Sequence, residues 1–285
     1  MEWLDKLNEC IKYIEDNLQG NIDYNEAAKI ACCSTYHFQR MFSYIAGIPL
    51  SEYIRQRKMT LAAFDLQKGN KFVDVSYKYG YESPTSFNRA FQKIHSVSPS
   101  VASKEGTVLK AYPPISFKIT IKGVKDMQYQ VIKRDEIRIV GLKKEMSKNI
   151  EDNFKEVPKF WSEVSQNNKL NEVISLMDEN SKGVLGVSAC MDIMDKWEYY
   201  IGVETNKEIK EGMYEYIIQP CTWAVFPGKG KMPEAIQEIE KRAITEWLPS
   251  SSYEYANEPD IELYLNANPL DSVFEVWVPI KEKQE

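Results

Sequence analysis

The amino-acid sequence repeats itself at an offset of 49 residues near its N-terminal end. Residues 34–45, S-T-Y-H-F-Q-R-M-F-S-Y-I, align with residues 83–94, S-P-T-S-F-N-R-A-F-Q-K-I. Both copies place apolar side chains at i, i+3, i+4 and i+7, the spacing of a helix that buries one face. Ser34 and Ser83 are candidate N-caps, and Pro84 occupies the favoured first helical position. The repeat therefore predicts two short amphipathic helices, each with a second face left to present.

A short helix and a tight turn precede each copy. The short helices are expected at residues 24–31 and 73–79, with turns at Cys32-Cys33 and at residues 80–82. This order, helix, turn and recognition helix, is that of a helix-turn-helix unit, which we call a reading head. Between the two heads, residues 50–67 read as one helix of 18 residues, about 27 Å long at 1.5 Å per residue. Such a spacer can hold two recognition helices near the roughly 34 Å between successive major-groove faces.

The outward faces of the two predicted recognition helices are polar and partly basic. They carry Tyr36, Gln39 and Arg40 in the first copy, and Thr85, Asn88, Arg89 and Gln92 in the second. In the major groove, Arg pairs with guanine, and Asn or Gln pairs with adenine. The alternative is a helical bundle whose exposed polar side chains are merely solvated. The repetition of the whole unit on a stiff spacer favours double-stranded DNA as the partner.

The distribution of charge is compatible with DNA binding. The chain of 285 residues has a net charge of −6. Residues 1–105 carry 13 Lys and Arg against 12 Asp and Glu, whereas the remaining 180 residues carry 23 against 30. The acidity therefore lies in the C-terminal part, and the N-terminal part keeps its positive charges locally. We expect the phosphate contacts to be few and well placed.

The cysteines and the apolar runs bear on location. The five cysteines include no C-x-x-C pair, and with two histidines they predict no metal framework. Reduced thiols of the cytoplasm fit this pattern better than a redox switch. No apolar run approaches the roughly 18–20 residues needed to cross a bilayer, and the acidic, amphipathic start does not read as a signal peptide. We expect a cytoplasmic protein with no membrane association, no metal and no cofactor.

The spacing of apolar residues changes after residue 112, from a helical period to a period of two. Pro113-Pro114 breaks the helices, and residues 115–121 alternate with period two. We predict an all-α DNA-binding domain over residues 1–107, a linker over residues 108–126 and an α+β domain over residues 127–285. In the last of these, two βαββ repeats on one sheet are expected. Their strands are predicted at residues 129–142, 184–193 and 197–205, and again at residues 213–226, 261–265 and 274–278.

Strand alternation in the C-terminal part brings carboxylates and aromatic rings together. Glu262 and Tyr264 share one face of their strand, Trp277 lies with a glutamate on another strand, and Trp197 and Tyr199 form an aromatic face. Carboxylates and rings on a concave sheet suit a lipophilic cation, through charge pairing and cation–π attraction. The alternative is an ordinary solvent-facing sheet with acidic residues. These five residues are the candidate ligand-binding set.

Residues 5–103 strongly resemble the AraC/XylS family of transcription regulators. The matching stretches are Y-I-R-Q-R at residues 53–57, G-Y-E-S at residues 80–83, F-N-R-A-F at residues 87–91 and S-P at residues 98–99. By position, the resemblance implies base contacts from Tyr36, Gln39, Arg40, Thr85, Ser86, Asn88 and Arg89. Ser96 departs from the family, which usually has Gly there, and so does Val101-Ala102 in place of Tyr-Arg. These departures concern the end of the last helix and leave the fold unaffected.

Residues 127–281 resemble the GyrI-like effector-binding domain. The matching stretches are residues 222–230, 246–249, 259–264 and 276–280. That family keeps its ligand-facing glutamate in the motif E-L-Y, which places it at Glu262 here. The combined order of domains resembles that of Rob-like members of the AraC/XylS family.

Together these features predict a monomeric, non-enzymatic, DNA-binding transcription regulator. We expect an activator that engages RNA polymerase and whose C-terminal domain binds a small, lipophilic cationic effector. In a first alternative the GyrI-like domain is a small-molecule hydrolase, with Glu262 and a neighbouring Tyr as acid and base. In a second alternative it is a protein-interaction module. The C-terminal half contains no His and no nucleophile elbow, which disfavours the hydrolase.

Overall fold

The computed structural model describes residues 2–118, 126–147, 150–191, 196–256, 258–266 and 268–283. The chain divides into two compact units, residues 1–120 and 121–285, so the division falls inside the expected linker. The first unit is all-α, and the second is an antiparallel sheet with helices. The expected fold class is therefore confirmed.

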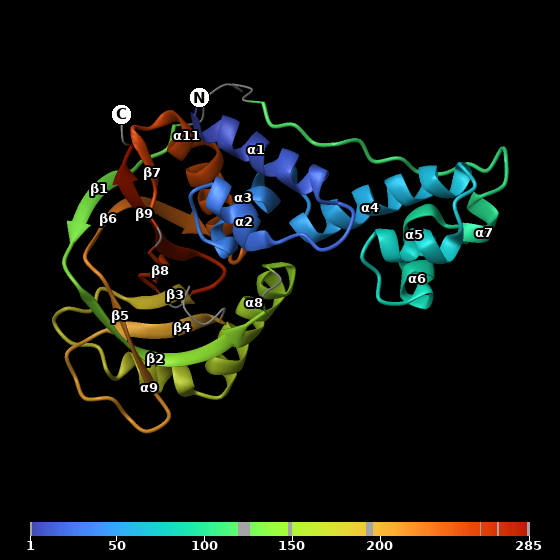
Figure 1. Cartoon of the computed structure of the whole chain (residues 1–285). Helices are drawn as coiled ribbons and strands as arrows, with labels where there is room; N and C mark the ends of the chain where they lie inside the picture. The colour runs from blue at the N-terminus through green and yellow to red at the C-terminus, as the bar shows by residue number, and fades with distance from the viewer. Residues whose placement is uncertain are drawn as a thin grey trace. The chain divides into compact units, whose positions relative to one another are not determined.

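Seven helices form the described part of the first unit (Figure 1). They are α1 (Glu2–Asp16), α2 (Tyr24–Ile30), α3 (Thr35–Ala46), α4 (Leu50–Gln67), α5 (Phe72–Lys78), α6 (Pro84–His95) and α7 (Pro99–Ala102). The hydroxyls of Ser34 and Ser83 accept the backbone N–H groups of His37 and Ser86, as the N-cap prediction requires. The spacer helix α4 has the predicted bounds. Two helix-turn-helix units therefore share one unit of structure, α2–α3 and α5–α6.

The C-terminal ends of the two recognition helices are also equivalent. Gly47 caps α3 with φ of 71°, and Ser96 caps α6 with φ of 63°, both in the left-handed region. Glycine adopts this conformation at little cost, whereas other residues seldom do. Ser96 therefore occupies the place where a glycine would be favoured, and α6 still ends as α3 does.

Residues 109–117 form an extended segment that we call the strap. Its backbone N–H groups at Lys110, Tyr112, Ile115 and Phe117 donate to His95 Nδ1, Thr60 Oγ1, Tyr53 Oη and Asn8 Oδ1, at 3.3, 3.0, 3.2 and 2.8 Å. The Phe117 ring is buried and lies edge-on to Phe42, 5.9 Å between ring centroids. These partners belong to α1, α3, α4 and α6, so the strap is docked along both reading heads.

The strap shows how part of the expected linker is arranged. Residues 109–117 are hydrogen-bonded to the helices, and residues 115–118 pair with no strand of the described chain, while residues 119–121 lie outside the described residues. The alternation with period two is that of an extended chain that buries every second side chain. Here helix side chains, and not a neighbouring strand, satisfy the backbone.

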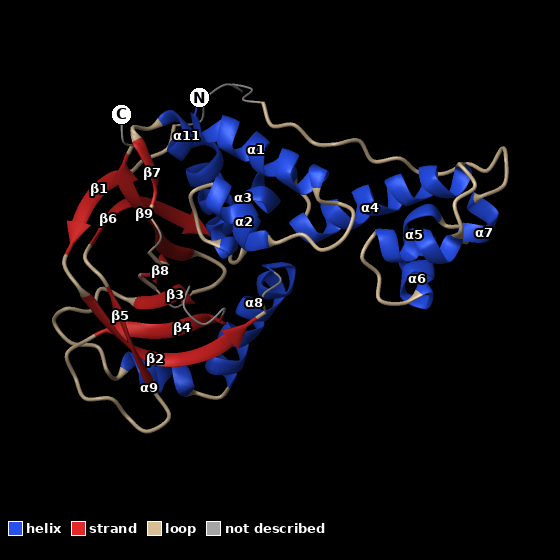
Figure 2. Ribbon diagram, viewed as in Figure 1, coloured by secondary structure: helices blue, strands red, loops and turns tan. Residues whose placement is uncertain are grey.

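The described residues of the second unit form one sheet of nine strands, with helices on it (Figure 2). The strands are β1 (Gln130–Arg134), β2 (Ile137–Met146), β3 (Val184–Met191), β4 (Lys196–Glu204), β5 (Tyr214–Ile218), β6 (Cys221–Gly230), β7 (Tyr253–Tyr255), β8 (Asp260–Tyr264) and β9 (Ser272–Glu282). Its helical segments are α8 (Ile150–Gln166), α9 (Lys169–Ile174), α10 (Glu234–Arg242), a π-helical turn (Ala243–Trp247) and α11 (Leu248–Ser250). The strand order is β1-β6-β9-β8-β3-β4-β2-β5, and β7 pairs with β9.

The sheet order shows the predicted internal repeat with one correction. The expected strands 129–142 and 213–226 are each divided into two consecutive strands, β1 and β2 or β5 and β6, because polar Asp135-Glu136 and Pro220 interrupt them. The two strands of each division pair with other strands and not with each other. Each repeat is therefore ββαββ, and the second also contains the short strand β7. Reversing the sheet order exchanges β1 with β5, β2 with β6, β3 with β8 and β4 with β9. The repeats consequently meet where β3 pairs with β8.

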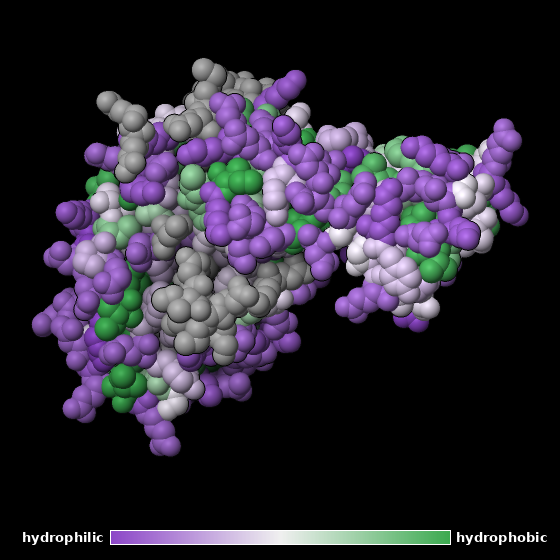
Figure 3. Space-filling model, viewed as in Figure 1, coloured by the Kyte–Doolittle hydropathy of each residue, from purple (hydrophilic) through white to green (hydrophobic). Residues whose placement is uncertain are grey.

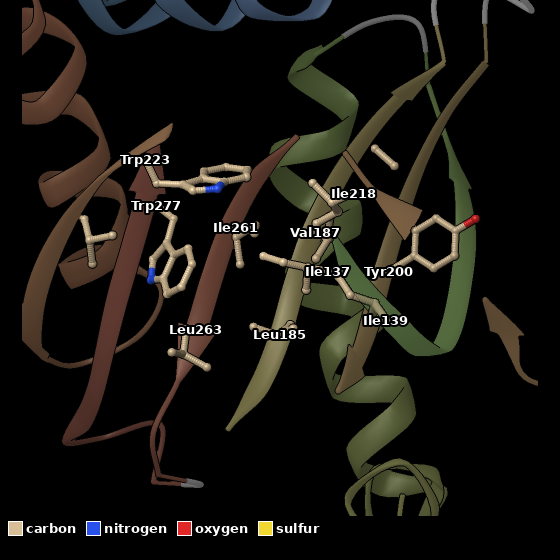
Figure 4. Packing of buried hydrophobic residues seen from close by; sticks show 12 residues of the cluster. Ile137, Ile139, Leu185, Val187, Tyr200, Ile218, Trp223, Ile261, Leu263 and Trp277 are labelled. Carbon is tan, nitrogen blue, oxygen red and sulfur yellow. The ribbon is translucent and has the colours of Figure 1, made fainter. Parts of the chain in front are cut away.

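The two faces of the sheet carry different cores. One face gathers Trp223, Trp277, Ile261, Leu263, Leu185, Val187, Ile137, Ile139, Ile218 and Tyr200 into an apolar cluster (Figure 4). On the other face, Phe274, Val276 and Tyr264 pack with residues of α10, while Tyr199 and Ile201 pack with residues of α8. The helix-covered face is the one that carries Glu262, because Glu262 is paired with Val276.

Candidate effector site and DNA-reading helices

The carboxylate of Glu262 is the centre of a hydrogen-bonded cluster on the helix-covered face. Its Oε2 accepts the hydroxyl of Tyr264, two residues along β8, and the hydroxyl of Tyr199 from β4, each at 2.8 Å. The strand alternation placed Glu262 and Tyr264 on one face, and the structure confirms this. The sheet then brings Tyr199 to the same carboxylate across β3. Three of the predicted ligand-binding residues thus lie together.

Trp161, on α8, completes the ring set. Its indole Nε1 donates to the Tyr199 hydroxyl at 3.0 Å, and its ring lies edge-on to Tyr264 with 4.8 Å between centroids. No local sequence pattern marks this tryptophan as a site residue. An indole N–H that is partly buried needs a hydrogen-bond partner, and Trp161 is half-buried. We call Glu262, Tyr199, Tyr264 and Trp161 the carboxylate cage.

Gly186 on β3 makes room for the carboxylate cage. It is the register partner of Glu262, at the centre of the sheet where the two repeats meet. A Cβ atom at this position would overlap the Tyr199 hydroxyl and lie 2.9 Å from Glu262 Oε2. Any side chain here would displace both groups, so the glycine is a requirement of the site. A lone glycine in a predicted strand suggests a close approach, but not to which residue.

The two tyrosines of the cage act as hydrogen-bond donors to its carboxyl group. Burial raises the pKa of both Tyr199 and Tyr264 well above the usual value, and the Glu262 carboxylate raises it further. Both tyrosines therefore remain protonated donors at neutral pH. The cage thus surrounds one carboxyl group with two hydroxyl donors and three aromatic rings.

Trp277 does not belong to this cluster, and the prediction that it lies beside Glu262 is wrong. Antiparallel pairing sets Glu262 opposite Val276 and Ile261 opposite Trp277. Since neighbouring residues of a strand point to opposite faces, Trp277 lies in the other core, where its Nε1 donates to Glu275 Oε2 at 2.8 Å. The alternation of side chains along β8 and along β9 agrees with the sequence pattern, but the register of β8 on β9 cannot be derived from that pattern.

Trp197 lies on β4 two residues before Tyr199, so the two share a face. It is half-buried, and it is paired with Met146 on β2 and Cys190 on β3. The expected aromatic face of β4 is therefore present. Trp197 is the second residue of β4 and lies nearer the end of the strand than Tyr199, which belongs to the carboxylate cage.

The second reading head presents its predicted residues to solvent. Thr85, Ser86 and Arg89 are exposed, and Asn88 is half-buried, on the first two turns of α6. The apolar stripe of the same helix, from Phe87 to Ile94, is buried in the core of the head. The amphipathic reading of this helix is therefore confirmed.

The first reading head is less open than predicted. Tyr36 is half-buried, while Gln39 and Arg40 are 2% and 5% exposed. The guanidinium of Arg40 lies 6.0 Å from the Tyr36 ring centroid and 5.6 Å from that of Tyr44. Arg40 thus lies between two rings of its own helix, one turn away on either side, at the i, i+4 spacing that brings helix side chains together.

Two general features accompany these sites. Within the described part of the chain, no helix is long and apolar enough to cross a membrane, and no group of three or more His, Cys, Asp or Glu could hold a metal ion. Hydrophilic side chains cover much of the face shown in Figure 3, with hydrophobic ones in small patches.

Comparison with known proteins gives matches for both units. The chain matches a family model described as integron-associated effector binding protein (Cass2) over residues 130–280, and one described as helix-turn-helix domain over residues 27–105. The HTH-type transcriptional activator AarP of Providencia stuartii is 35% identical over 96 residues, which are 33% of this chain and 71% of AarP. The multiple antibiotic resistance protein MarA of Escherichia coli is 33% identical over 94 residues, 33% of this chain and 74% of MarA. A solved structure of SAV2435 bound to tetraphenylphosphonium aligns with a TM-score of 0.49 and 20% identity, over 54% of this chain and 94% of that chain.

Proposed function

Because the chain belongs to the AraC-type helix-turn-helix transcription regulators, with a C-terminal effector-binding domain of the Cass2 family, we propose that it controls transcription in response to a lipophilic organic cation. The observation that carries the proposal is the Glu262 carboxylate, held by two tyrosine hydroxyls among three aromatic rings. We propose that the cation binds at this carboxylate cage.

The chemistry of the cage selects for charge and for apolar surface together. A cation gains charge pairing with Glu262 and attraction to the faces of neighbouring rings, each ring contributing about 0.5–2 kcal/mol. Aromatic or aliphatic groups on the same ligand gain by leaving water. An anion of the same shape would be repelled by the Glu262 carboxylate and would gain only from the transfer of its apolar groups out of water. The site should therefore distinguish ligands by sign.

A pair of ions matched in size tests this selectivity. Tetraphenylphosphonium and tetraphenylborate have nearly the same shape and opposite charge. Titrated into the full-length protein and followed by tryptophan fluorescence, the cation is expected to bind at least about tenfold more tightly, a difference of about 1.4 kcal/mol. Equal affinities, or tighter binding of the borate, would contradict the proposal. Binding of neither ion would favour a protein-interaction role for the domain.

We infer that the cage binds its ligand and does not catalyse a reaction of it. Tyr199 and Tyr264 both donate to the same carboxylate oxygen, and their raised pKa keeps each hydroxyl protonated, so neither is available as a base at neutral pH. The family model that matches residues 130–280 is described as an effector binding protein. This disfavours the hydrolase alternative. Loss of an ester or amide substrate on incubation with the protein would restore it.

We propose that Tyr36, Gln39, Arg40, Thr85, Ser86, Asn88 and Arg89 contact bases in the major groove. Arg89→Ala is expected to cost about 1–3 kcal/mol on a specific duplex and much less on random DNA, since a bidentate contact to guanine is lost. Arg40→Ala is expected to do the same at a second base pair. The specific duplex is obtained by selection from a random library with the wild-type protein.

Lys93→Ala is the charge-matched control for Arg89→Ala. Lys93 is exposed, on the same helix and one turn further from its N-terminal end. Its loss should weaken specific and random duplexes alike, as expected for a phosphate contact. Equal losses on both duplexes for Arg89→Ala would show that Arg89 also contacts only phosphate.

We further infer an activator that acts as a monomer on bacterial DNA. AarP is an activator, and contact with RNA polymerase is the usual route to activation. Both reading heads lie on one chain, so a single copy suffices to reach two successive groove faces. Action on chromosomal DNA places the protein in the cytoplasm.

A further inference from the structure

A single lysine links the two reading heads. Lys58 lies on the spacer helix α4, and its Nζ donates to the carbonyl of Gly20 at 2.6 Å and to that of Tyr79 at 3.0 Å. Gly20 lies in the loop that leads from α1 into α2, the first helix of the first head, and Tyr79 caps the C-terminal end of α5 in the second. One ammonium group therefore bonds to a backbone carbonyl at the entry to the first head and to one inside the second.

The heads also approach each other directly at this point. Gly80 has φ of 78°, and a Cβ atom there would lie 2.8 Å from the Gly20 carbonyl oxygen and 3.3 Å from Lys58 Nζ. Only glycine combines this left-handed conformation with such a close approach. Beside Lys58, the backbone at Gly80 therefore packs directly against the backbone at Gly20, and neither segment has room to shift.

The carbonyl of Tyr79 is itself fixed on the spacer. The Tyr79 hydroxyl donates to Asp65 Oδ2 at 2.9 Å, and Lys78 Nζ lies 2.7 Å from the same oxygen. Asp65 belongs to α4, as Lys58 does. The end of α5 is therefore held on α4 by Asp65 and by Lys58. Lys58 also bonds to Gly20 and so extends this attachment toward the first head.

Relative placement of the heads decides which DNA they can read together. Each base pair inserted between two subsites moves one of them by about 3.4 Å and turns it by about 35° around the duplex axis. A rigid pair of heads tolerates only one spacing, whereas two heads free to rotate tolerate several. We propose that Lys58 is a positioning residue that sets the spacing of the two DNA subsites.

This proposal goes beyond effector binding and base contacts. Lys58 need not touch DNA, and its removal is expected to relax the spacing requirement. A lysine that only stabilised the fold would lower affinity equally for every spacing. The measured quantity is therefore a ratio of affinities, which uniform loss of folded protein does not change.

The experiment uses the full-length protein and a duplex selected by the wild type from a random library. Versions with one base pair inserted or deleted between the two protected segments are compared with it. The wild type is expected to lose about tenfold or more in affinity on each altered duplex, the usual cost of a displaced contact. Lys58→Met, which keeps the length of the side chain and removes its charge, is expected to lose less than about threefold.

Two further variants make the result decisive. Lys68→Met removes an exposed lysine just after α4 and should keep the wild-type profile of affinity against spacing. Lys58→Arg retains a charged donor and should restore most of the discrimination. If Lys58→Met does not fold, Lys58→Gln takes its place with the same expectation. A wild-type spacing profile in the Lys58 variants would overturn the proposal, even if their affinity falls.

Discussion

Replacement of Glu262 by glutamine is expected to weaken tetraphenylphosphonium binding about a hundredfold, because removing one partner of a buried charge pair costs about 3–5 kcal/mol and each 1.4 kcal/mol is a factor of ten. We take the lower end of this range, since Glu262 is only half-buried. The tyrosine donors remain in the variant, but they then meet a neutral amide. The affinity is measured by fluorescence titration and by calorimetry.

Glu275→Gln is the matched control for this substitution. Glu275 is also half-buried and also accepts an aromatic donor, Trp277 Nε1, but it lies on the opposite face of the neighbouring strand. Its replacement should leave the affinity for the cation within about a factor of two of the wild type. If Glu262→Gln binds the cation as the wild type does, the cage is not the cation site. Equal losses in both variants would indicate a general effect of negative charge.

The second large effect is expected in the DNA-binding unit, where Glu15→Gln should lower its free energy of unfolding by about 3 kcal/mol. Arg57 Nη2 and Nε approach the Glu15 carboxylate at 2.7 and 2.9 Å, and the Tyr53 hydroxyl donates to it at 2.6 Å. Burial alone would lower the pKa of Arg57, but its bonds to Glu15 outweigh this and raise the pKa. Without Glu15 the guanidinium would remain buried and unpaired.

The strap provides a local measurement of this loss. Arg57 also donates to the Tyr112 carbonyl, and the Tyr53 hydroxyl accepts the Ile115 N–H, so the ion pair supports the strap directly. Hydrogen exchange of residues 109–117 should accelerate in Glu15→Gln, together with a lower urea midpoint for the unit. Glu26→Gln, which breaks an exposed pair with Lys29, should change stability by less than about 1 kcal/mol. A similar small change in Glu15→Gln would contradict the expectation.

A double substitution separates the pair from its parts. Glu15→Leu with Arg57→Met replaces the ions by apolar groups of comparable size. Because the cost arises from one charge left alone, the double variant should be more stable than either single one. If the two losses simply add, the pair is not coupled and the structural interpretation of Glu15 is wrong.

Local rules explain which parts of the fold could be predicted. The bounds of α4, the caps at Ser34 and Ser83 and the shared face of Glu262 and Tyr264 depend on residues near one another in the chain, so the sequence contains them. The repeat in the second unit was also visible, since each copy has its own periodicity. The sheet order then arranges these copies symmetrically about β3 and β8.

The errors all concern contacts between distant segments. Trp277 was placed on the wrong face because the register of β8 on β9 determines its neighbours, and a pattern within one strand does not fix that register. Trp161 and Gly186 reach the cage from other elements, so no local motif marks them.

The strap has a consequence for how such proteins are assembled in evolution. A gene fusion that joined a new sensory unit directly after Thr107 would keep every helix of the two reading heads. It would nevertheless remove the backbone donors that Asn8, Tyr53 and His95 receive from the strap. A junction after Phe117 would preserve these hydrogen bonds, so the segment that must be inherited as one piece extends beyond the last helix to the end of the strap. Recombination within residues 109–117 should therefore be tolerated less well than recombination after them.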